Sequence, residues 1–326
     1  MIELTNICKT FKVARRNAGM KAAVHSLFHR EYERIEALRN ISFTIPDGEM
    51  VGYIGPNGAG KSSTIKVMSG ILTPDSGQCL INGRIPWKDR ISHVKEIGVV
   101  FGQRSQLWWD VPVADSFELI RDIYAIPDSV YRSNLSQLSE MLEIGTIMKT
   151  PTRQLSLGQR MRCEIVASLL HDPKILFLDE PTIGLDAVSK IAVRDFIHRV
   201  NREKKTTVIL TTHDMQDIEA LTQRILLIGK GQILLDGTLD ALKSRYEDHK
   251  TLTVTYSAGQ VPQLLSPGLR CLQQQEGRLV AAVDVSLLPV SQAIGELSQA
   301  LEITDLTVAG VSIDEVILSL YRDFQI

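Results

Sequence analysis

Residues 55 to 62 have the types and the spacing needed to bind a phosphate chain. They read Gly-Pro-Asn-Gly-Ala-Gly-Lys-Ser, which fits the pattern G-x-x-x-x-G-K-[ST], and they join an apolar stretch typical of a strand to a stretch typical of a helix. Glycines let the backbone wrap an anion and point its N–H groups inward, and a helix N-terminus adds partial positive charge. We expect Lys61 to neutralise the β and γ phosphates and the Ser62 hydroxyl to ligate Mg²⁺. The residues expected to hold the phosphates are Gly55, Asn57, Gly58, Ala59, Gly60, Lys61, Ser62 and Ser63.

Two adjacent carboxylates, Asp179 and Glu180, end an apolar run that is typical of a buried strand. Successive residues of a strand face opposite sides, so the two carboxylates can have different roles. We expect Asp179 to bind Mg²⁺, directly or through water, and Glu180 to polarise the water that attacks the γ-phosphate. An acidic pair at a strand end is commonly a solvated terminus, so this interpretation depends on the phosphate-binding pattern upstream.

The string Leu155-Ser156-Leu157-Gly158-Gln159 opens a helical stretch ahead of the Asp179 strand. A helix N-terminus with a hydroxyl group and bare backbone is an anion site. With these residues the sequence resembles the ATP-binding cassette family, the nucleotide-binding subunits of ABC transporters, whose signature is usually L-S-G-G-Q. Leu157 stands in place of the first glycine. The resemblance implies that Ser156, Gly158 and Gln159 bind the γ-phosphate of an ATP held by another subunit.

Other landmarks of the family follow in the expected order. Gln103 is similar to the Q-loop glutamine, which senses Mg²⁺ and the attacking water. Residues 181–186 resemble the D-loop, in which Asp186 would reach across a dimer, and His213 resembles the switch histidine that contacts the γ-phosphate. Phe11 stands where the family places an aromatic residue that stacks on adenine, a position more often held by tyrosine.

The resemblance covers residues 1 to 240 and implies an α/β P-loop NTPase fold. Such a fold has a RecA-like parallel sheet, antiparallel strands at the N-terminus and a helical subdomain. It implies an ATPase that uses ATP and Mg²⁺ and dimerises around two ATP molecules, because the Lys61 and Ser156 of one chain would serve different sites. The second chain would be a copy or a related cassette ATPase, so a homodimer and a heterodimer both remain open.

The resemblance also implies integral membrane permease subunits as partners and a peripheral location on the cytoplasmic face of the inner or plasma membrane. The residues around Gln103 and Ser156 are similar to those of ABC-2-type exporters, a branch that includes drug- and viologen-efflux ATPases, so export of a small molecule is expected. A soluble cassette ATPase without a membrane partner and an importer ATPase are the alternatives. In the segment 105–113, Trp108 and Trp109 are expected either to receive a permease helix or to pack in the core.

The composition sets limits on these interpretations. The chain has 326 residues, 44% of them hydrophobic, which is ordinary for a soluble globular protein and excludes a disordered chain. Its 36 basic and 38 acidic residues give a net charge of −2, so no nucleic-acid partner is expected. The sequence has no apolar run long enough to span a membrane, and its four cysteines lack metal-binding or redox spacing.

The elements that must position these residues can be read from hydrophobic spacing. Strands are expected over 1–13 and 41–54, and strands at 175–178 and 208–210, separated by helices, indicate a parallel sheet covered on both faces. The region 104–172 is expected to be mostly helical. Between the first two strands, the segment 14–40 is expected to form a basic amphipathic helix, either solvated or lying on a membrane or membrane partner. Its apolar residues at helical spacing are Val24, Leu27, Phe28, Tyr32 and Ile35.

We expect two domains, a nucleotide-binding domain over 1–245 and a small α+β accessory domain over 246–326. In the second domain the pattern predicts the order β-α-β-β-α-β-α, which fits a split βαβ arrangement. A short helix is expected over 261–265, and Ser312 is expected to cap the last helix.

Overall fold

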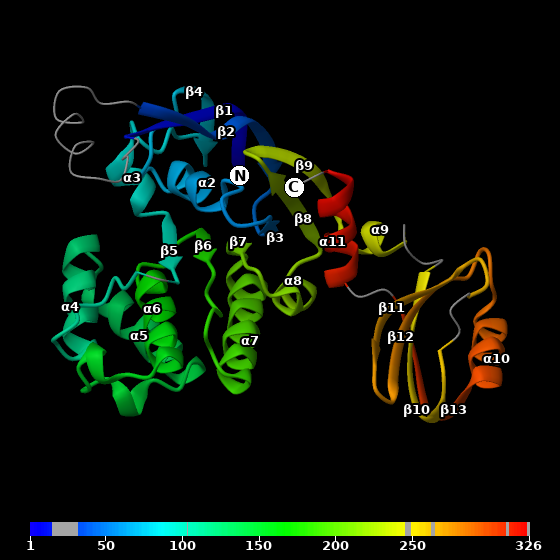
Figure 1. Ribbon diagram of the computed structural model, residues 1–326. Helices are drawn as coiled ribbons and strands as arrows, with labels where there is room; N and C mark the ends of the chain where they lie inside the picture. Colours follow the sequence, from blue (N-terminus) through cyan, green and yellow to red (C-terminus); the bar gives the residue numbers. More distant parts are fainter. Residues whose placement is uncertain (15–31, 103, 245–248, 262–264, 311–312, 325–326) are drawn as a thin grey trace, which may run out of the picture. The chain divides into compact units, whose positions relative to one another are not determined.

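The computed structural model describes residues 1–14, 32–102, 104–244, 249–261, 265–310 and 313–324 (Figure 1). The chain divides into two compact units, Met1–Asp236 and Gly237–Gln325. The boundary expected at 245/246 remains a prediction, and the strand β9 (Gln232–Thr238) passes from the first unit into the second.

A six-stranded sheet forms the centre of the first unit, with the strand order β5-β6-β7-β3-β8-β9. Its first five strands in the chain are β3 (Met50–Ile54), β5 (Ile97–Phe101), β6 (Ile175–Asp179), β7 (Thr207–Thr211) and β8 (Arg224–Gly229). The pairs β5–β6, β6–β7, β7–β3 and β3–β8 are parallel, as expected. Parallel pairing brings the carboxyl ends of β3, β6 and β7 to the same edge, where ligands bind in sheets of this kind.

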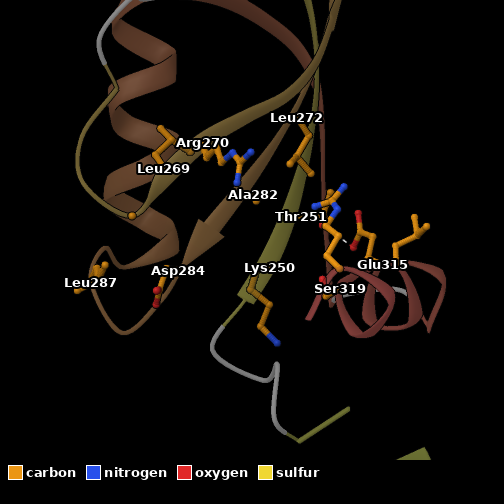
Figure 2. Close-up of a pocket in the computed structure, with 13 residues that line it drawn as sticks. Lys250, Thr251, Leu269, Arg270, Leu272, Ala282, Asp284, Leu287, Glu315 and Ser319 are labelled. Carbon is orange, nitrogen blue, oxygen red and sulfur yellow. Dashed lines mark hydrogen bonds between the residues drawn. The ribbon is translucent and has the colours of Figure 1, made fainter. Parts of the chain in front are cut away.

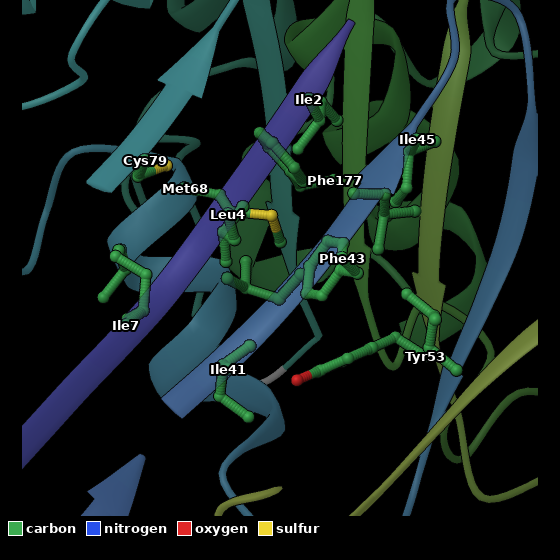
Figure 3. Packing of buried hydrophobic residues seen from close by; sticks show 14 of the residues in the cluster. Ile2, Leu4, Ile7, Ile41, Phe43, Ile45, Tyr53, Met68, Cys79 and Phe177 are labelled. Carbon is green, nitrogen blue, oxygen red and sulfur yellow. The ribbon is translucent and has the colours of Figure 1, made fainter. Parts of the chain in front are cut away.

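A three-stranded antiparallel sheet, in the order β2-β1-β4, packs on the first sheet. Its strands are β1 (Ile2–Ala14), β2 (Tyr32–Ile45) and β4 (Ser76–Ile81). The buried apolar residues of β1 and β2 share one core with Tyr53, Met68 and Phe177 (Figure 3). Because Met68 ends α2 (Lys61–Met68) and Phe177 lies in β6, this core holds α2 against the central sheet.

The expected helix over 14–40 is wrong in the part that the structure describes. Residues from Tyr32 onward form β2, which pairs antiparallel with β1 from Ala14 back to Ile2. This pairing satisfies the backbone hydrogen bonds of the segment without a helix. Tyr32 and Ile35 are 56% and 46% exposed on the strand, so their spacing by three residues reflects no buried helical face. Val24, Leu27 and Phe28 lie outside the described residues.

The helical region expected over 104–172 is confirmed. It contains α4 (Val113–Tyr124), α5 (Asp128–Met141) and α6 (Leu157–Leu169), which lie together in Figure 1, and two short 3₁₀ turns, Gly145–Ile147 and Thr152–Gln154. The other helices among the described residues of this unit are α3 (Arg90–Val94), α7 (Ala187–Lys204) and α8 (Met215–Leu221). Among the described helices, none has the length and apolar character needed to cross a membrane.

The second unit has a four-stranded antiparallel sheet in the order β11-β12-β10-β13. Its elements are α9 (Leu239–Ser244), β10 (His249–Gly259), β11 (Leu269–Gln275), β12 (Arg278–Asp284), α10 (Val290–Ala300), β13 (Leu301–Gly310) and α11 (Ile313–Asp323). This strand order is that of a split βαβ arrangement, as the sequence predicts. The helix expected over 261–265 and the cap expected at Ser312 depend on positions 262–264 and 312, which lie outside the described residues.

Candidate active site

The phosphate-binding pattern forms a tight loop between β3 and α2. A Cβ atom on Gly55 would lie 2.2 Å from the carbonyl oxygen of Ile228. A Cβ atom on Gly60 would lie 2.7 Å from the carbonyl oxygen of Ala37, and Gly60 has φ +116°. Both positions therefore require glycine, because the backbones of β8 and β2 approach the loop this closely. The loop ends where α2 begins, at Lys61.

Lys61 is buried against this loop, with a residue exposure of 6%. Its Nζ donates hydrogen bonds to the carbonyl oxygens of Gly55 at 2.7 Å and Pro56 at 3.1 Å. Burial lowers the pKa of Lys61, whereas the nearby carboxylates of Glu180 and Asp179 raise it in part. The loop thus holds a weakly hydrated cation by its own carbonyl groups, ready to exchange them for the oxygens of an anion.

The carboxylate of Asp179 joins three elements at the end of β6. Its Oδ2 accepts a hydrogen bond from the Ser62 hydroxyl at 3.0 Å, and its Oδ1 accepts one from the Thr211 hydroxyl at 2.5 Å. The Ser62 hydroxyl and this carboxylate are the hard oxygen ligands that Mg²⁺ prefers. Within the described ranges no group of three or more His, Cys, Asp or Glu side chains is placed to hold a metal. The donor set fits Mg²⁺, which commonly takes one or two protein carboxylates and completes its shell with phosphate and water.

The side chain of Glu180 makes different contacts from that of Asp179, but strand alternation is not the cause, because β6 ends at Asp179. Its N–H donates to the carbonyl oxygen of Thr211 at 2.9 Å, and its φ of +56° turns the chain out of the strand. Its Oε1 lies 2.8 Å from Nε2 of His213. The structure therefore brings together a carboxylate and an imidazole whose residues are far apart in the sequence, an arrangement suited to orienting a water molecule and moving a proton.

Some of these groups line one cavity of about 490 Å³, whose lining does not include Lys61 or Thr211. Of the residues predicted individually from the sequence, five line it: Asn57, Ser62, Asp179, Glu180 and His213. Ile183, from the segment 181–186, also lines it. Gly102 and Arg104 also line it, but Gln103 between them lies outside the described residues, so its role stays a prediction. The sequence analysis did not identify Arg104 or Thr211. A polar residue directly after the apolar run 208–210 was the available signal for Thr211.

The string around Ser156 lies elsewhere in the chain, and residues 155–159 do not line this cavity. Ser156 caps α6: its Oγ accepts from the N–H of Gln159 at 3.2 Å, and its N–H donates to Gln159 Oε1 at 3.0 Å. A Cβ atom on Gly158 would lie 2.4 Å from the hydroxyl of Ser189. That hydroxyl donates to Asp186 at 2.8 Å, so the expected signature packs against the start of α7.

Asp186 and the turn before it each contact a nearby segment: Asp186 bonds to Ser189, and Gly184 packs against Leu157. Hydrogen bonds from the N–H and the hydroxyl of Ser189 lower the pKa of Asp186. Gly184 has φ +69°, and a Cβ atom there would lie 2.9 Å from the side chain of Leu157. The large side chain of Leu157 therefore packs where Gly184 has none, because any side chain at position 184 would clash with Leu157.

Phe11 lies on β1, directly opposite Ile35 of β2. It is 37% exposed, and the ammonium of Lys9 lies 5.9 Å from the centre of its ring. Ala37 lies two residues after Ile35 on β2, and its carbonyl oxygen is next to Gly60. An exposed aromatic ring thus stands on the strand next to the one that borders the phosphate-binding loop.

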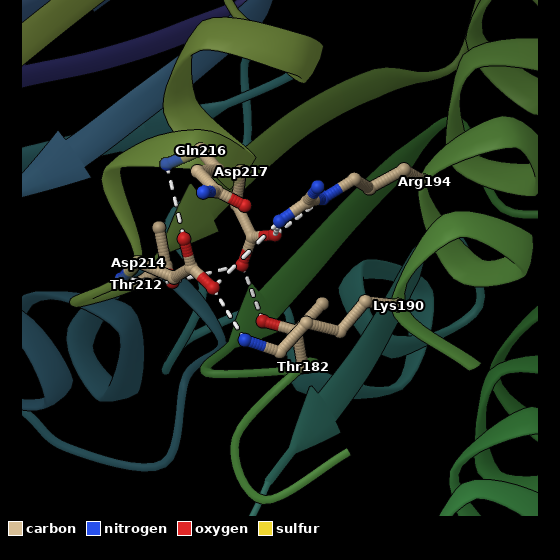
Figure 4. A network of polar contacts seen from close by, with 7 residues as sticks. All are labelled: Thr182, Lys190, Arg194, Thr212, Asp214, Gln216 and Asp217. Atoms are coloured by element: carbon tan, nitrogen blue, oxygen red, sulfur yellow. Dashed lines mark hydrogen bonds and ion pairs between the residues drawn. The ribbon is translucent and has the colours of Figure 1, made fainter. Parts of the chain in front are cut away.

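A buried polar network holds the segment that carries His213 (Figure 4). The carboxylate of Asp217 is fully buried and accepts hydrogen bonds from Thr182 and, at 3.0 Å, from Thr212. It also pairs with Arg194 of α7 at 2.5 Å. Thr182 follows Glu180 by two residues, and Thr212 directly precedes His213. The Asp217 carboxylate therefore holds together the two segments that carry Glu180 and His213, and we call this set of contacts the Asp217 clamp.

A parallel sheet with a glycine-rich loop before α2, a buried lysine and an acidic end of β6 defines a P-loop nucleotide-binding domain. The family model described as ABC transporter matches residues 38–183. The linearmycin resistance ATP-binding protein LnrL of Bacillus subtilis is 30% identical over 228 residues, which are 70% of this chain and 73% of that protein. The chain belongs to the family of ATP-binding proteins of ABC transporters.

Further comparisons agree with this assignment. The daunorubicin resistance ATP-binding protein DrrA3 of Streptomyces coeruleorubidus is 29% identical over 298 residues, 90% of this chain and 94% of that protein. A dimeric structure of the ATP-binding cassette MJ0796 in a post-hydrolysis state, bound to ADP and Pi, has a TM-score of 0.61 and 26% identity, covering 73% of this chain and 99% of that one. The chain spans only 28% of a larger relative, ABC transporter A family member 8 of Dictyostelium discoideum.

Replacing Asp217 by alanine should lower the free energy of unfolding by about 3–5 kcal/mol. The change leaves two buried hydroxyl groups without their acceptor and leaves Arg194 only its longer contact with Asp214, at 3.7 Å. Chemical denaturation of the two purified proteins measures the difference. The matched control is Asp236→Ala, which breaks a more exposed pair with Arg224 and should cost less than about 1 kcal/mol. Equal losses in the two variants would contradict the assigned role of Asp217.

Proposed function

We propose that this chain binds and hydrolyses ATP as a dimer and powers the export of a small molecule through separate membrane subunits. The observation that carries the proposal is the convergence of Lys61, Ser62, Asp179, Glu180 and His213 on one edge of the parallel sheet.

In the proposed site, the N–H groups of residues 57–63 and the ammonium of Lys61 bind the phosphates. Lys61 replaces its contacts with the carbonyls of Gly55 and Pro56 by contacts with phosphate oxygens. Ser62 and Asp179 hold Mg²⁺, which neutralises charge on the phosphates when it is bound. Phe11 offers its exposed ring to the adenine base.

Glu180 accepts the proton of the attacking water in this mechanism, and His213 orients Glu180 through their 2.8 Å contact. The Asp217 clamp holds the segments of both residues in place through its hydrogen bonds with Thr182 and Thr212. Gln103, next to Gly102 and Arg104 at the cavity, is proposed to sense the metal and the water.

Dimerisation follows from the separation of the two expected half-sites. Ser156, Gly158 and Gln159 lie at the start of α6 and outside the cavity that Lys61 serves. A second chain would therefore have to supply them, with Asp186 at the border between the two chains. The similar cassette MJ0796 has a dimeric structure with ADP and Pi bound, which supports this arrangement. Closure on ATP and opening after hydrolysis would form a two-state switch biased by a ligand.

The segment from Ser105 to Val113 is the proposed docking surface for a membrane subunit. Ser105 and the N–H of Gln106 bond to the buried carboxylate of Glu164, whose pKa is raised by burial. Trp108 and Trp109 remain 41% and 51% exposed on this anchored backbone. Export is supported by the names of two relatives, which refer to daunorubicin resistance and linearmycin resistance.

Replacing Glu180 by glutamine should reduce ATP hydrolysis at least ~100-fold, while ATP binding and the ATP-dependent dimer persist, because the carboxylate acts on the water and contributes little to affinity. Phosphate release and size-exclusion chromatography with ATP measure the two effects. Glu140→Gln, at an exposed position of α5, is the matched control and should behave as wild type. Wild-type turnover by the Glu180 variant would remove this residue from the mechanism.

Replacing Ser156 by arginine should abolish hydrolysis and the ATP-dependent dimer without changing the affinity of the monomer for ATP, since Ser156 lies outside its own chain's cavity. Equilibrium binding of a fluorescent ATP analogue and phosphate release test both parts. Ser136→Arg, an exposed serine on α5, serves as the control. If the Ser156 variant hydrolyses ATP normally, the proposed composite site is wrong.

Replacing Trp109 by alanine should weaken recovery of an integral membrane protein in a pull-down from detergent-solubilised membranes of the native host, with ATP binding in solution unchanged. Phe324→Ala, which removes another exposed ring, should leave the recovery intact. A parallel loss of ATP binding would show that Trp109 packs the domain instead. Recovery of soluble partners alone by the wild type would overturn the transport part of the proposal and favour a soluble cassette ATPase.

A further inference from the structure

The second unit contains a cavity of about 570 Å³ between its sheet and α11 (Figure 2). This volume is in the range of sites for small organic ligands, about 300–1,000 Å³. All of its lining residues belong to the unit Gly237–Gln325. The proposed function makes no use of it.

The sheet side of the cavity is one row of residues across three strands. Thr251 of β10 pairs with Ala282 of β12, and Ala282 pairs with Arg270 of β11. The neighbours of this row in sequence, such as Leu252 and Val283, are fully buried on the opposite face, in the core of the unit. The small side chain of Ala282 in the middle of the row leaves room above the sheet.

The helix side is one stripe of α11. The helix buries four apolar residues, Ile313, Val316, Ile317 and Leu320. Another stripe of the helix, formed by Glu315, Leu318, Ser319 and Arg322, lines the cavity. In Figure 2, Glu315 and Ser319 of this stripe lie beside Thr251, and the Thr251 hydroxyl lies 3.4 Å from Glu315 Oε2.

The lining combines apolar surface with accessible positive charge. Leu272, Leu287 and Leu318 are 47%, 65% and 52% exposed around the cavity. Such a gathering of exposed large apolar side chains is typical of a binding site.

Lys250, Arg270 and Arg322 also line the cavity, and in the part of the chain that the structure describes they form no ion pair. The two acidic residues of the lining are already engaged. Asp284 Oδ1 accepts hydrogen bonds from the N–H of Ser286 at 3.0 Å and from its hydroxyl at 2.5 Å, and Glu315 contacts Thr251.

We propose that this cavity is a binding site for a small amphipathic organic anion. The apolar part of the ligand would lie on Ala282 and the exposed leucines, and its carboxylate or phosphate would pair with Arg270 and Arg322. An anionic group held between two guanidinium groups gains charge-assisted hydrogen bonds that an uncharged analogue lacks. Because Arg270 belongs to the sheet and Arg322 to α11, the bound anion would bridge the two walls.

Titration calorimetry of the full chain with sodium octanoate tests the proposal, with octan-1-ol and inorganic phosphate as probes that each lack one half of the ligand. Octanoate should bind saturably at one site, at least tenfold more tightly than either control probe. Arg270→Glu and Arg322→Glu should each weaken octanoate binding at least tenfold. Ala282→Phe, which fills the cavity and keeps its charges, should also abolish binding.

Arg278→Glu is the matched control, because Arg278 is an exposed arginine of the same sheet outside the lining. It should leave octanoate binding unchanged. Circular dichroism of every variant checks the fold. Equal affinity for octanoate and octan-1-ol, or for octanoate and phosphate, would overturn the proposal. So would wild-type affinity in both folded variants at Arg270 and Arg322, or an equal loss in the Arg278 variant.

Discussion

The two hydrogen bonds of the Asp179 carboxylate tie together the elements on which the whole site depends. One reaches Ser62 at the start of α2, and the other reaches Thr211 at the end of β7. They are possible because parallel pairing places the carboxyl ends of β3, β6 and β7 at one edge. Every reactive group of the site is supplied by a segment that leaves the sheet at this edge, so the chemistry depends on strand order more than on any single loop.

The same edge explains why one chain holds only half of the proposed machinery. Asn57 and Ser62 of the loop line the cavity together with Glu180 and His213, whereas Ser156 caps α6 and Gly158 packs against Ser189. In the proposed mechanism the phosphates are fully satisfied only when a second chain approaches. The Asp217 carboxylate supports this arrangement, because its hydrogen bonds hold the turn after Glu180 to the segment of His213.

The second unit uses its sheet differently. One face carries the core beneath α10, which accounts for the stability of the unit. The other face carries a row from Arg270 through Ala282 to Thr251 and stays partly open toward α11. An antiparallel sheet can serve both purposes because alternate residues face opposite sides.

Local patterns determined much of this protein. The loop around Lys61, the apolar strand ending in Asp179 and Glu180, the helical region after residue 104 and the order of strands and helices along the second unit all follow from spacing over a few residues. The expectation of a helix at Tyr32 and Ile35 was wrong, because two apolar residues three positions apart also occur on a strand. Pairing with β1 decided that this segment is a strand and not a helix, and β1 is a separate segment of the chain.

Only the tertiary structure decided which distant groups meet: the contact of Glu180 with His213, the burial of Asp217 between Thr182 and Thr212, and the cavity lined by Arg270 and Arg322. Hydrophobic periodicity records how each segment is buried, but it carries no information on which strands become neighbours. The sequence therefore identified the chemical groups of the site, and the order and register of the strands decided their geometry.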